Sequence, residues 1–296
     1  MVQKPRRRPE ISIPTPLTRE TLDIAALHKP QGHKFTHGHA LILSGGAGRT
    51  GAARLAARAA LRVGAGLVTL GVPPAAQMEV AGHITSVMLT RVPDGAALQE
   101  VLTDTRLTAL CLGPGLGLHD EKHDLIQVVL KSGLPAVLDA DALTLISQSD
   151  RLFAALHPAC IITPHGGEFS RLFGDLSAKL DGADLTGRAA VVGQAAQRAG
   201  CTVLLKGAQT LIAAPDGACD LHDATGPRAA PWLATAGAGD VLSGILCGLL
   251  ARGLPMRSAA GLATYLHVEA ARTFGPGLIA EDLPEQLPTV FRNLGL

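Results

Sequence analysis

A glycine-rich turn that opens into an apolar helix is the strongest chemical signal in the sequence. Gly237 and Gly239 allow positive φ and close approach of a ligand, and residues 241–250 follow with helical hydrophobic spacing. Unpaired N–H groups and the positive end of the helix dipole meet at such a start, which favours phosphate. We therefore expect an anion hole formed by Ala236, Gly237, Ala238 and Gly239.

Asp240 is unexpected in a turn built for anions. A carboxylate there would repel phosphate, unless it takes a proton from a group that attacks or leaves the phosphoryl centre. Asp is also common as a helix N-cap, where its side chain accepts a backbone N–H bond. The spacing alone leaves both interpretations open.

Further chemical residues follow the ends of other apolar runs. Asp139 and Asp141 could hold Mg²⁺ through water, or one of them could cap the next helix. His165 and Glu168 come next, where a strand ends; His165 could also be a hydrogen-bonded loop residue, and Glu168 a first-turn carboxylate favoured by the helix dipole. Lys206 could pair with a phosphate or be solvated.

The elements that must position these residues alternate between strand and helix. Apolar runs at 40–43, 67–72, 86–89, 109–112, 136–138 and 161–162 are mostly followed by helical patterns. This alternation predicts a doubly wound, mostly parallel α/β sheet with helices on both faces, whose ligands bind beyond the carboxyl ends of the strands. After Gly200 consecutive strands predict an antiparallel edge. We expect a partly ordered extension at 1–30 and one catalytic domain at 31–296.

Composition narrows the class of partner. The 296 residues carry 26 Lys and Arg against 25 Asp and Glu, so a formal charge of +1 gives no general attraction to nucleic acid or membrane. A small-molecule partner is expected instead. Five scattered cysteines without a metal-binding spacing, and no export or membrane-spanning segment, predict a reduced, cytoplasmic protein.

Taken together in order, these motifs resemble the ribokinase-like fold and, within it, the ADP- or ATP-dependent NAD(P)H-hydrate dehydratases. The Gly237–Asp240 loop is similar to the anion hole and catalytic Asp of ribokinase-like kinases. The narrower match is the ordered set His37-Gly38-His39, SGGAGRTGAA from Ser44, GPGLG from Gly113, LDADAL from Leu138, TPHGGE from Thr163, KGAQT from Lys206 and ATAGAGDVLSG from Ala234.

The resemblance implies an enzyme that dehydrates the S-form of hydrated NADH or NADPH, using ADP or ATP with Mg²⁺ and releasing phosphate and AMP or ADP. Asp240 would deprotonate the ring hydroxyl so that it can be phosphorylated and then lost as phosphate. The motif positions imply that the hydrated dinucleotide contacts Ala52, Gly115, His165 and Asp240. They imply that the nucleotide contacts Lys206, Gly207, Ala208, Gln209, Thr210 and Gly239. The metal ligands stay unknown.

Two other functions share part of this pattern. A ribokinase-like kinase for a vitamin precursor or sugar would carry the same loop at 237–240, and a nucleotide-binding regulator would not need Asp240. The resemblance also implies a homo-oligomer, with a tetramer expected, and a functional link to an NAD(P)H-hydrate epimerase. Because only about 30 residues precede the domain, we expect that epimerase on a separate chain.

Overall fold

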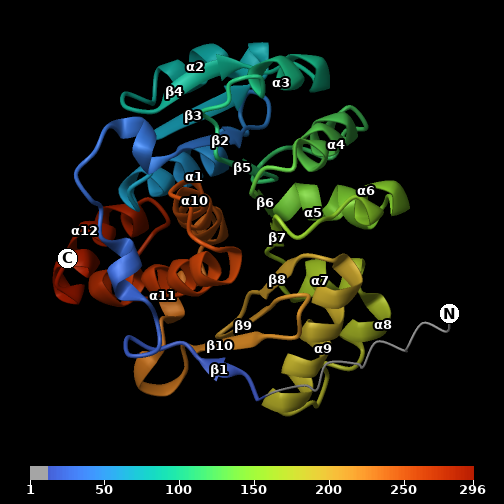
Figure 1. Ribbon diagram of the computed structural model, residues 1–296, viewed down its shortest axis with the longest axis vertical. Helices are drawn as coiled ribbons and strands as arrows, with labels where there is room; N and C mark the ends of the chain where they lie inside the picture. Colours follow the sequence, from blue (N-terminus) through green and yellow to red (C-terminus); the bar gives the residue numbers. More distant parts are fainter. Residues whose placement is uncertain (1–12) are drawn as a thin grey trace, which may run out of the picture.

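Ten strands form one sheet in the computed structural model, which describes residues 13–296 (Figure 1). Their order across the sheet is β1-β10-β9-β8-β7-β6-β5-β2-β3-β4. The bounds are β1 (Thr15–Pro16), β2 (His39–Leu43), β3 (Leu67–Val72), β4 (Met88–Arg91), β5 (Ala109–Leu112), β6 (Ala136–Leu138), β7 (Cys160–Ile162), β8 (Thr202–Leu205), β9 (Gln209–Ala213) and β10 (Cys219–Asp223).

Helices cover both faces of this sheet, and each of α1 to α5 and α7 comes between two consecutive strands of the chain or opens such a connection. Their bounds are α1 (Gly51–Arg62), α2 (Gln77–Ala81), α3 (Gly95–Val101), α4 (Lys122–Ser132), α5 (Ala140–Ser147), α6 (Asp150–Ala154), α7 (Gly166–Leu172), α8 (Gly174–Ser177), α9 (Leu185–Ala199), α10 (Ala238–Ala251), α11 (Met256–Phe274) and α12 (Asp282–Leu294). Short 3-10 turns occur at Ile24–Leu27, Lys34–His37, Pro74–Ala76, Gly226–Arg228 and Pro231–Leu233. In Figure 1, α1, α10, α11 and α12 lie on one side and α4 to α9 on the other.

The pairing confirms the predicted fold class. Strands β2 to β8 pair in parallel, while β8 with β9 and β9 with β10 pair antiparallel. The runs at 67–72, 109–112 and 136–138 are strands with those bounds, whereas the run expected at 86–89 begins two residues later, at Met88. Parallel central strands are buried on both faces, so short apolar runs identify them well.

Residues 15–30 include a strand that hydrophobic pattern did not predict. Thr15 and Pro16 pair in parallel with Asp220 and Leu221 of β10, so β1 lies beyond the antiparallel strands at the edge of the sheet. Leu17 and Leu27 are buried in the core. A strand of two residues is too short to show the alternation by which strands are recognised.

The two faces of the sheet carry different cores. On the α10 side, Ala53, Ala56 and Ala60 of α1 recur at helical spacing and are fully buried. A Cβ on Gly244 or Gly248 of α10 would overlap the backbone of α1 at Ala56 or Ala60. The other face packs Leu, Ile, Val and Phe side chains from α4 to α9. The helix that carries Asp240, α10, therefore packs against α1 with the two backbones almost in contact.

Candidate active site

The turn before α10 takes its shape from Gly237. This residue is the N-cap of α10 with φ +89°, and a Cβ there would approach Leu55 Cδ1 to 2.8 Å and Ala280 Cβ to 2.9 Å. Asp240 is the third helical residue, so the alternative that it is the N-cap is wrong. The expectation of positive φ holds at Gly237 but not at Gly239, which is helical. Gly239 instead leaves room for Lys206, whose Nζ lies 3.5 Å from the point that a Cβ would occupy.

Asp240 has the electrostatics of a proton acceptor. Burial, followed by repulsion from Asp139, raises the pKa of the Asp240 carboxyl from 3.8 to about 6, while Lys206 opposes the shift. A general base works best when its pKa lies near the operating pH, because it is then mostly deprotonated yet still basic. The Asp240 carboxylate is suited to removing a proton at neutral pH.

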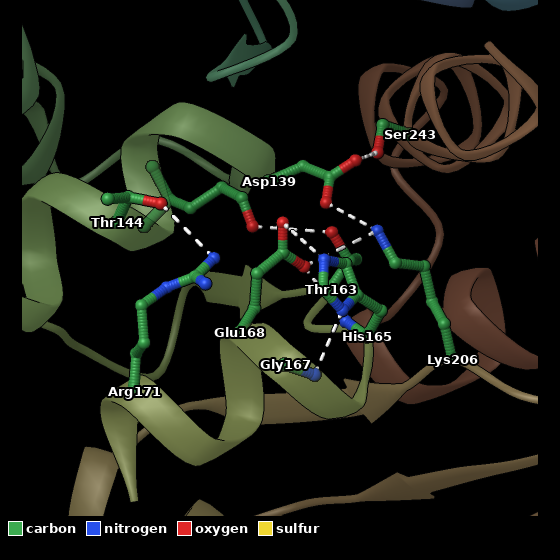
Figure 2. Close-up of polar contacts among 10 residues, drawn as sticks. Asp139, Thr144, Thr163, His165, Gly167, Glu168, Arg171, Lys206 and Ser243 are labelled. Atoms are coloured by element: carbon green, nitrogen blue, oxygen red, sulfur yellow. Dashed lines mark hydrogen bonds and ion pairs between the residues drawn. The ribbon is translucent and has the colours of Figure 1, made fainter. Parts of the chain in front are cut away.

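Asp139 lies between Lys206 and α10, and its side chain does not cap α5. Lys206 Nζ donates to Asp139 Oδ1 at 2.7 Å, and Ser243 Oγ on α10 donates to Asp139 Oδ2 at 2.7 Å (Figure 2). Asp139 is the N-cap residue of α5 by position, but its side chain makes no capping bond. Its side chain is only 1% exposed, so the carboxylate forms a buried ion pair.

Glu168 and His165 form the first turn of α7 beside this pair. Glu168 Oε2 accepts the backbone N–H of His165 at 2.8 Å, and His165 Nδ1 accepts the N–H of Gly167 at 3.0 Å, which is a capping box. Lys206 Nζ also lies 3.8 Å from Glu168 Oε2. Figure 2 shows the lysine directed at both carboxylates from its own side of the site. Lys206 is thus paired rather than solvated.

Two glycine-rich loops, 44–51 and 113–117, pack against each other. Three glycines of the 113–117 loop have positive φ, and a Cβ on Gly115 would lie 3.5 Å from Ala52 Cβ. A Cβ on Gly45 would overlap the Gly115 carbonyl. Asp141 Oδ2 accepts the N–H of Gly117 at 2.8 Å, which joins this loop to α5. The structure therefore brings the predicted substrate residues Ala52 and Gly115 together.

A cavity of about 780 Å³ opens where β8, β9, α10 and α11 meet. Of the predicted nucleotide and anion residues, its lining includes Lys206, Gly207, Ala208, Thr210, Ala238 and Gly239, and it also includes the predicted substrate residue His165. The side chain of Gln209 is engaged elsewhere, because its amide accepts from Arg188 at 3.0 Å and donates to Asp223 at 3.1 Å. The volume is in the range of pockets that hold small ligands and cofactors.

The α11 wall of the cavity contains no residue to which the sequence analysis assigned a binding or catalytic role. Thr264, His267 and Val268 line it, and burial lowers the pKa of His267 to about 4, so its ring is neutral. A buried helix has the same apolar spacing whether it faces a core or a cavity, so no periodic signal marks these residues. Ser243 was missed as well, although a serine in an otherwise apolar helix was a visible irregularity.

The mostly parallel sheet, the helix start at Gly237 and the cavity beside Lys206 are those of a ribokinase-like fold. Residues 40–288 match the family model described as NAD(P)H-hydrate dehydratase, and the chain belongs to this family. The chain is 40% identical over 277 residues to the bifunctional NAD(P)H-hydrate repair enzyme Nnr of Moorella thermoacetica, covering 89% of this chain and 51% of that protein. It spans about half the length of the curated relatives it matches.

Solved structures agree with this assignment. The ADP/ATP-dependent NAD(P)H-hydrate dehydratase of Bacillus subtilis, co-crystallised with ATP and Mg²⁺, is 29% identical with a TM-score of 0.75, covering 96% of this chain and 99% of that chain. A ribokinase-like superfamily protein of Enterococcus faecalis has a TM-score of 0.77 at 23% identity, with 95% and 96% of the chains covered, and supports the fold alone.

Proposed function

We propose that the chain catalyses the nucleotide-dependent dehydration of the S-form of hydrated NADH or NADPH, which restores the reduced cofactor and releases phosphate with AMP or ADP. The observation that carries this proposal is a half-buried carboxylate, Asp240, whose pKa is raised to about 6 at the start of a helix. That helix start borders a cavity that contains Lys206. Membership of the dehydratase family supplies the substrate class.

In the proposed chemistry, Asp240 acts on the substrate hydroxyl, and the neighbouring turn and Lys206 act on the phosphoryl group. Hydroxide is a poor leaving group, so the ring hydroxyl of the hydrated cofactor is first phosphorylated and then leaves as phosphate. Asp240 removes the hydroxyl proton, while N–H groups of the 236–240 turn and the Lys206 ammonium stabilise charge on the transferred phosphoryl group. Ala52, Gly115 and His165 would contact the hydrated dinucleotide, while Gly239 and the residues from Lys206 to Thr210 would contact the nucleotide.

Mg²⁺ belongs to this proposal as the partner of the nucleotide phosphates. Within residues 13–296, no group of three or more His, Cys, Asp or Glu side chains is arranged to hold a metal ion. Mg²⁺ commonly keeps several waters and is bound largely by substrate phosphates, so such a closed group is not required. Asp139, Asp141 and Glu168 all repel charge on Asp240, and this negative surrounding fits a cation. When bound, the ion neutralises phosphate charge.

The cellular setting is inferred from weaker observations. All five cysteines are free and buried, which supports a reducing compartment such as the cytoplasm. No helix among residues 13–296 is long and apolar enough to cross a membrane. Assembly into a tetramer and the functional link to an epimerase stay predictions, and light scattering of the purified protein tests the first.

The test is recovery of absorbance at 340 nm when the protein is mixed with Mg²⁺, hydrated NADH and either ADP or ATP. We expect recovery with one or both nucleotides, and the faster reaction identifies the phosphoryl donor. Asp240→Asn protein is the matched control, because it keeps the shape of the site and removes the base. No recovery with either nucleotide, together with phosphorylation of a small alcohol, would assign the chain to the kinases of this fold.

A further inference from the structure

Asp139 lies where three elements of the site meet. It follows the last residue of β6, accepts from Lys206 at the end of β8, and accepts from Ser243 in α10, with 2.7 Å to each donor. Figure 2 shows the carboxylate between these two donors. Its side chain is 1% exposed, and Ser243 is fully buried. With one oxygen committed to each donor, the carboxylate is held in a single orientation.

The backbone around Asp139 is shaped to hold it there. Ala140 has φ +47° and is the one non-glycine residue with positive φ among residues 13–296. Gly113 has φ +129°, and a Cβ on it would overlap the Asp139 carbonyl. Strained backbone persists only where its surroundings over-determine it, and such strain is concentrated at functional sites. The fold thus maintains an unfavourable conformation next to this carboxylate.

The two donors connect Asp139 to two neighbouring turns of α10. Lys206 Nζ lies beside Gly239 in the first turn of α10, and its second carboxylate, Glu168 at 3.8 Å, belongs to α7. Ser243 follows Asp240 by three residues, so it lies on the same side of α10 one turn further on. One carboxylate therefore ties both the lysine and the helix that carries Asp240 to the end of β6.

We propose that Asp139 is a positioning residue that holds the Lys206 ammonium against the first turn of α10 and fixes that turn through Ser243. The inference rests on the proposed function, because it assigns Lys206 and this turn to the nucleotide phosphates. Without the Asp139 charge, Lys206 keeps only Glu168, on α7 rather than beside α10. Asparagine at position 139 preserves the shape and removes that charge.

The test is a double-mutant cycle on MgADP binding, measured by calorimetry. Lys206→Met should weaken binding about 10-fold or more in the wild-type background, because a charge-assisted bond to phosphate is lost. In the Asp139→Asn background the same change should cost less than about 3-fold, because the lysine is no longer held at the phosphate. An equal loss in both backgrounds would show that Asp139 does not position Lys206.

Ser243→Ala tests the other half of the proposal and decides the matter if Asp139→Asn does not fold. We expect kcat to fall about 10- to 100-fold, as for a slight misplacement of reacting groups, with the MgADP Kd within about 2-fold of wild type. Ser147→Ala is the matched control, since Ser147 donates within α5 to the Thr144 carbonyl. Wild-type kcat in Ser243→Ala, or an equal loss in Ser147→Ala, would overturn the role assigned to Ser243.

Calorimetry needs only MgADP, so the binding cycle remains readable whether or not the protein dehydrates hydrated NADH. Failure of wild-type protein to restore absorbance at 340 nm would count against the dehydratase proposal alone. Additive losses in the binding cycle would count against Asp139 alone.

Discussion

The two faces of the sheet are packed by opposite means. On the face with α1 and α10, small residues let the helix backbones meet, and added Cβ atoms on Gly244 and Gly248 would overlap α1. On the face with α4 to α9, large side chains such as Phe169 and Phe173 fill the space between helices and sheet. Helices in backbone contact have little freedom to shift, whereas interlocked side chains can adjust their rotamers. The helix that carries Asp240 is on the face where an added side-chain atom cannot be accommodated by a small shift.

The largest expected effect is that of Gly244→Ala, which adds one methyl group to the α1 and α10 contact. Alanine favours a helix over glycine by about 1 kcal/mol, but its Cβ would overlap the Ala56 backbone. We expect the free energy of unfolding to fall by about 3 kcal/mol, at the upper end of overpacking effects. Urea denaturation measures it, and unchanged stability would mean that the two helices can separate freely.

Asp240→Asn should separate activity from stability on this face. Turnover should fall at least about 10²-fold, as for loss of a positioned base. The wild-type rate should rise with pH through about 6, because the Asp240 pKa is about 6 and the base must be deprotonated. Both are measured from 340 nm recovery across pH 5–8. An unchanged rate, or a flat profile around pH 6, would remove Asp240 from the mechanism.

Asp240→Asn should lower turnover but raise the free energy of unfolding. The folded carboxyl has a pKa of about 6, above its unfolded value, so between about pH 4 and 6 the folded state keeps a proton that the unfolded state loses. Wild-type stability therefore falls as pH rises through this range. Asparagine avoids this loss, and above pH 6 the variant should be more stable by about 1–3 kcal/mol in the same urea assay.

Gly193→Ala should have the smallest effect and completes the comparison between the faces. Gly193 lies inside α9, on the face of large side chains, and a Cβ there meets no atom of residues 13–296 within 4 Å. The substitution is chemically identical to that at Gly244, but here only helix propensity should act. We expect stabilisation by about 0.5–1 kcal/mol. Destabilisation comparable to that of Gly244→Ala would remove the distinction between the two faces.

Local residue chemistry predicted the fold and part of the site. Gly237 needed no tertiary knowledge, because a positive φ before an apolar helix is a local requirement. The Asp139–Ser243 contact joins residues 104 positions apart, and it depends on which strand ends become neighbours. From the sequence, Asp139 could be a helix cap or a magnesium ligand. The structure rules out the side-chain cap. The contacts of Asp139 with Lys206 and Ser243 depend on where β6, β8 and α10 converge, which no local pattern predicts.

The edge of the sheet also has a consequence for the timing of synthesis. Thr15 of β1 pairs with Asp220 of β10, so two adjacent strands come from segments about 205 residues apart in the chain. A ribosome that adds about 5–20 residues per second needs about 10–40 s to cover that interval. During that time β10 has not been made, and this edge of the sheet forms only after most of the chain has been synthesised.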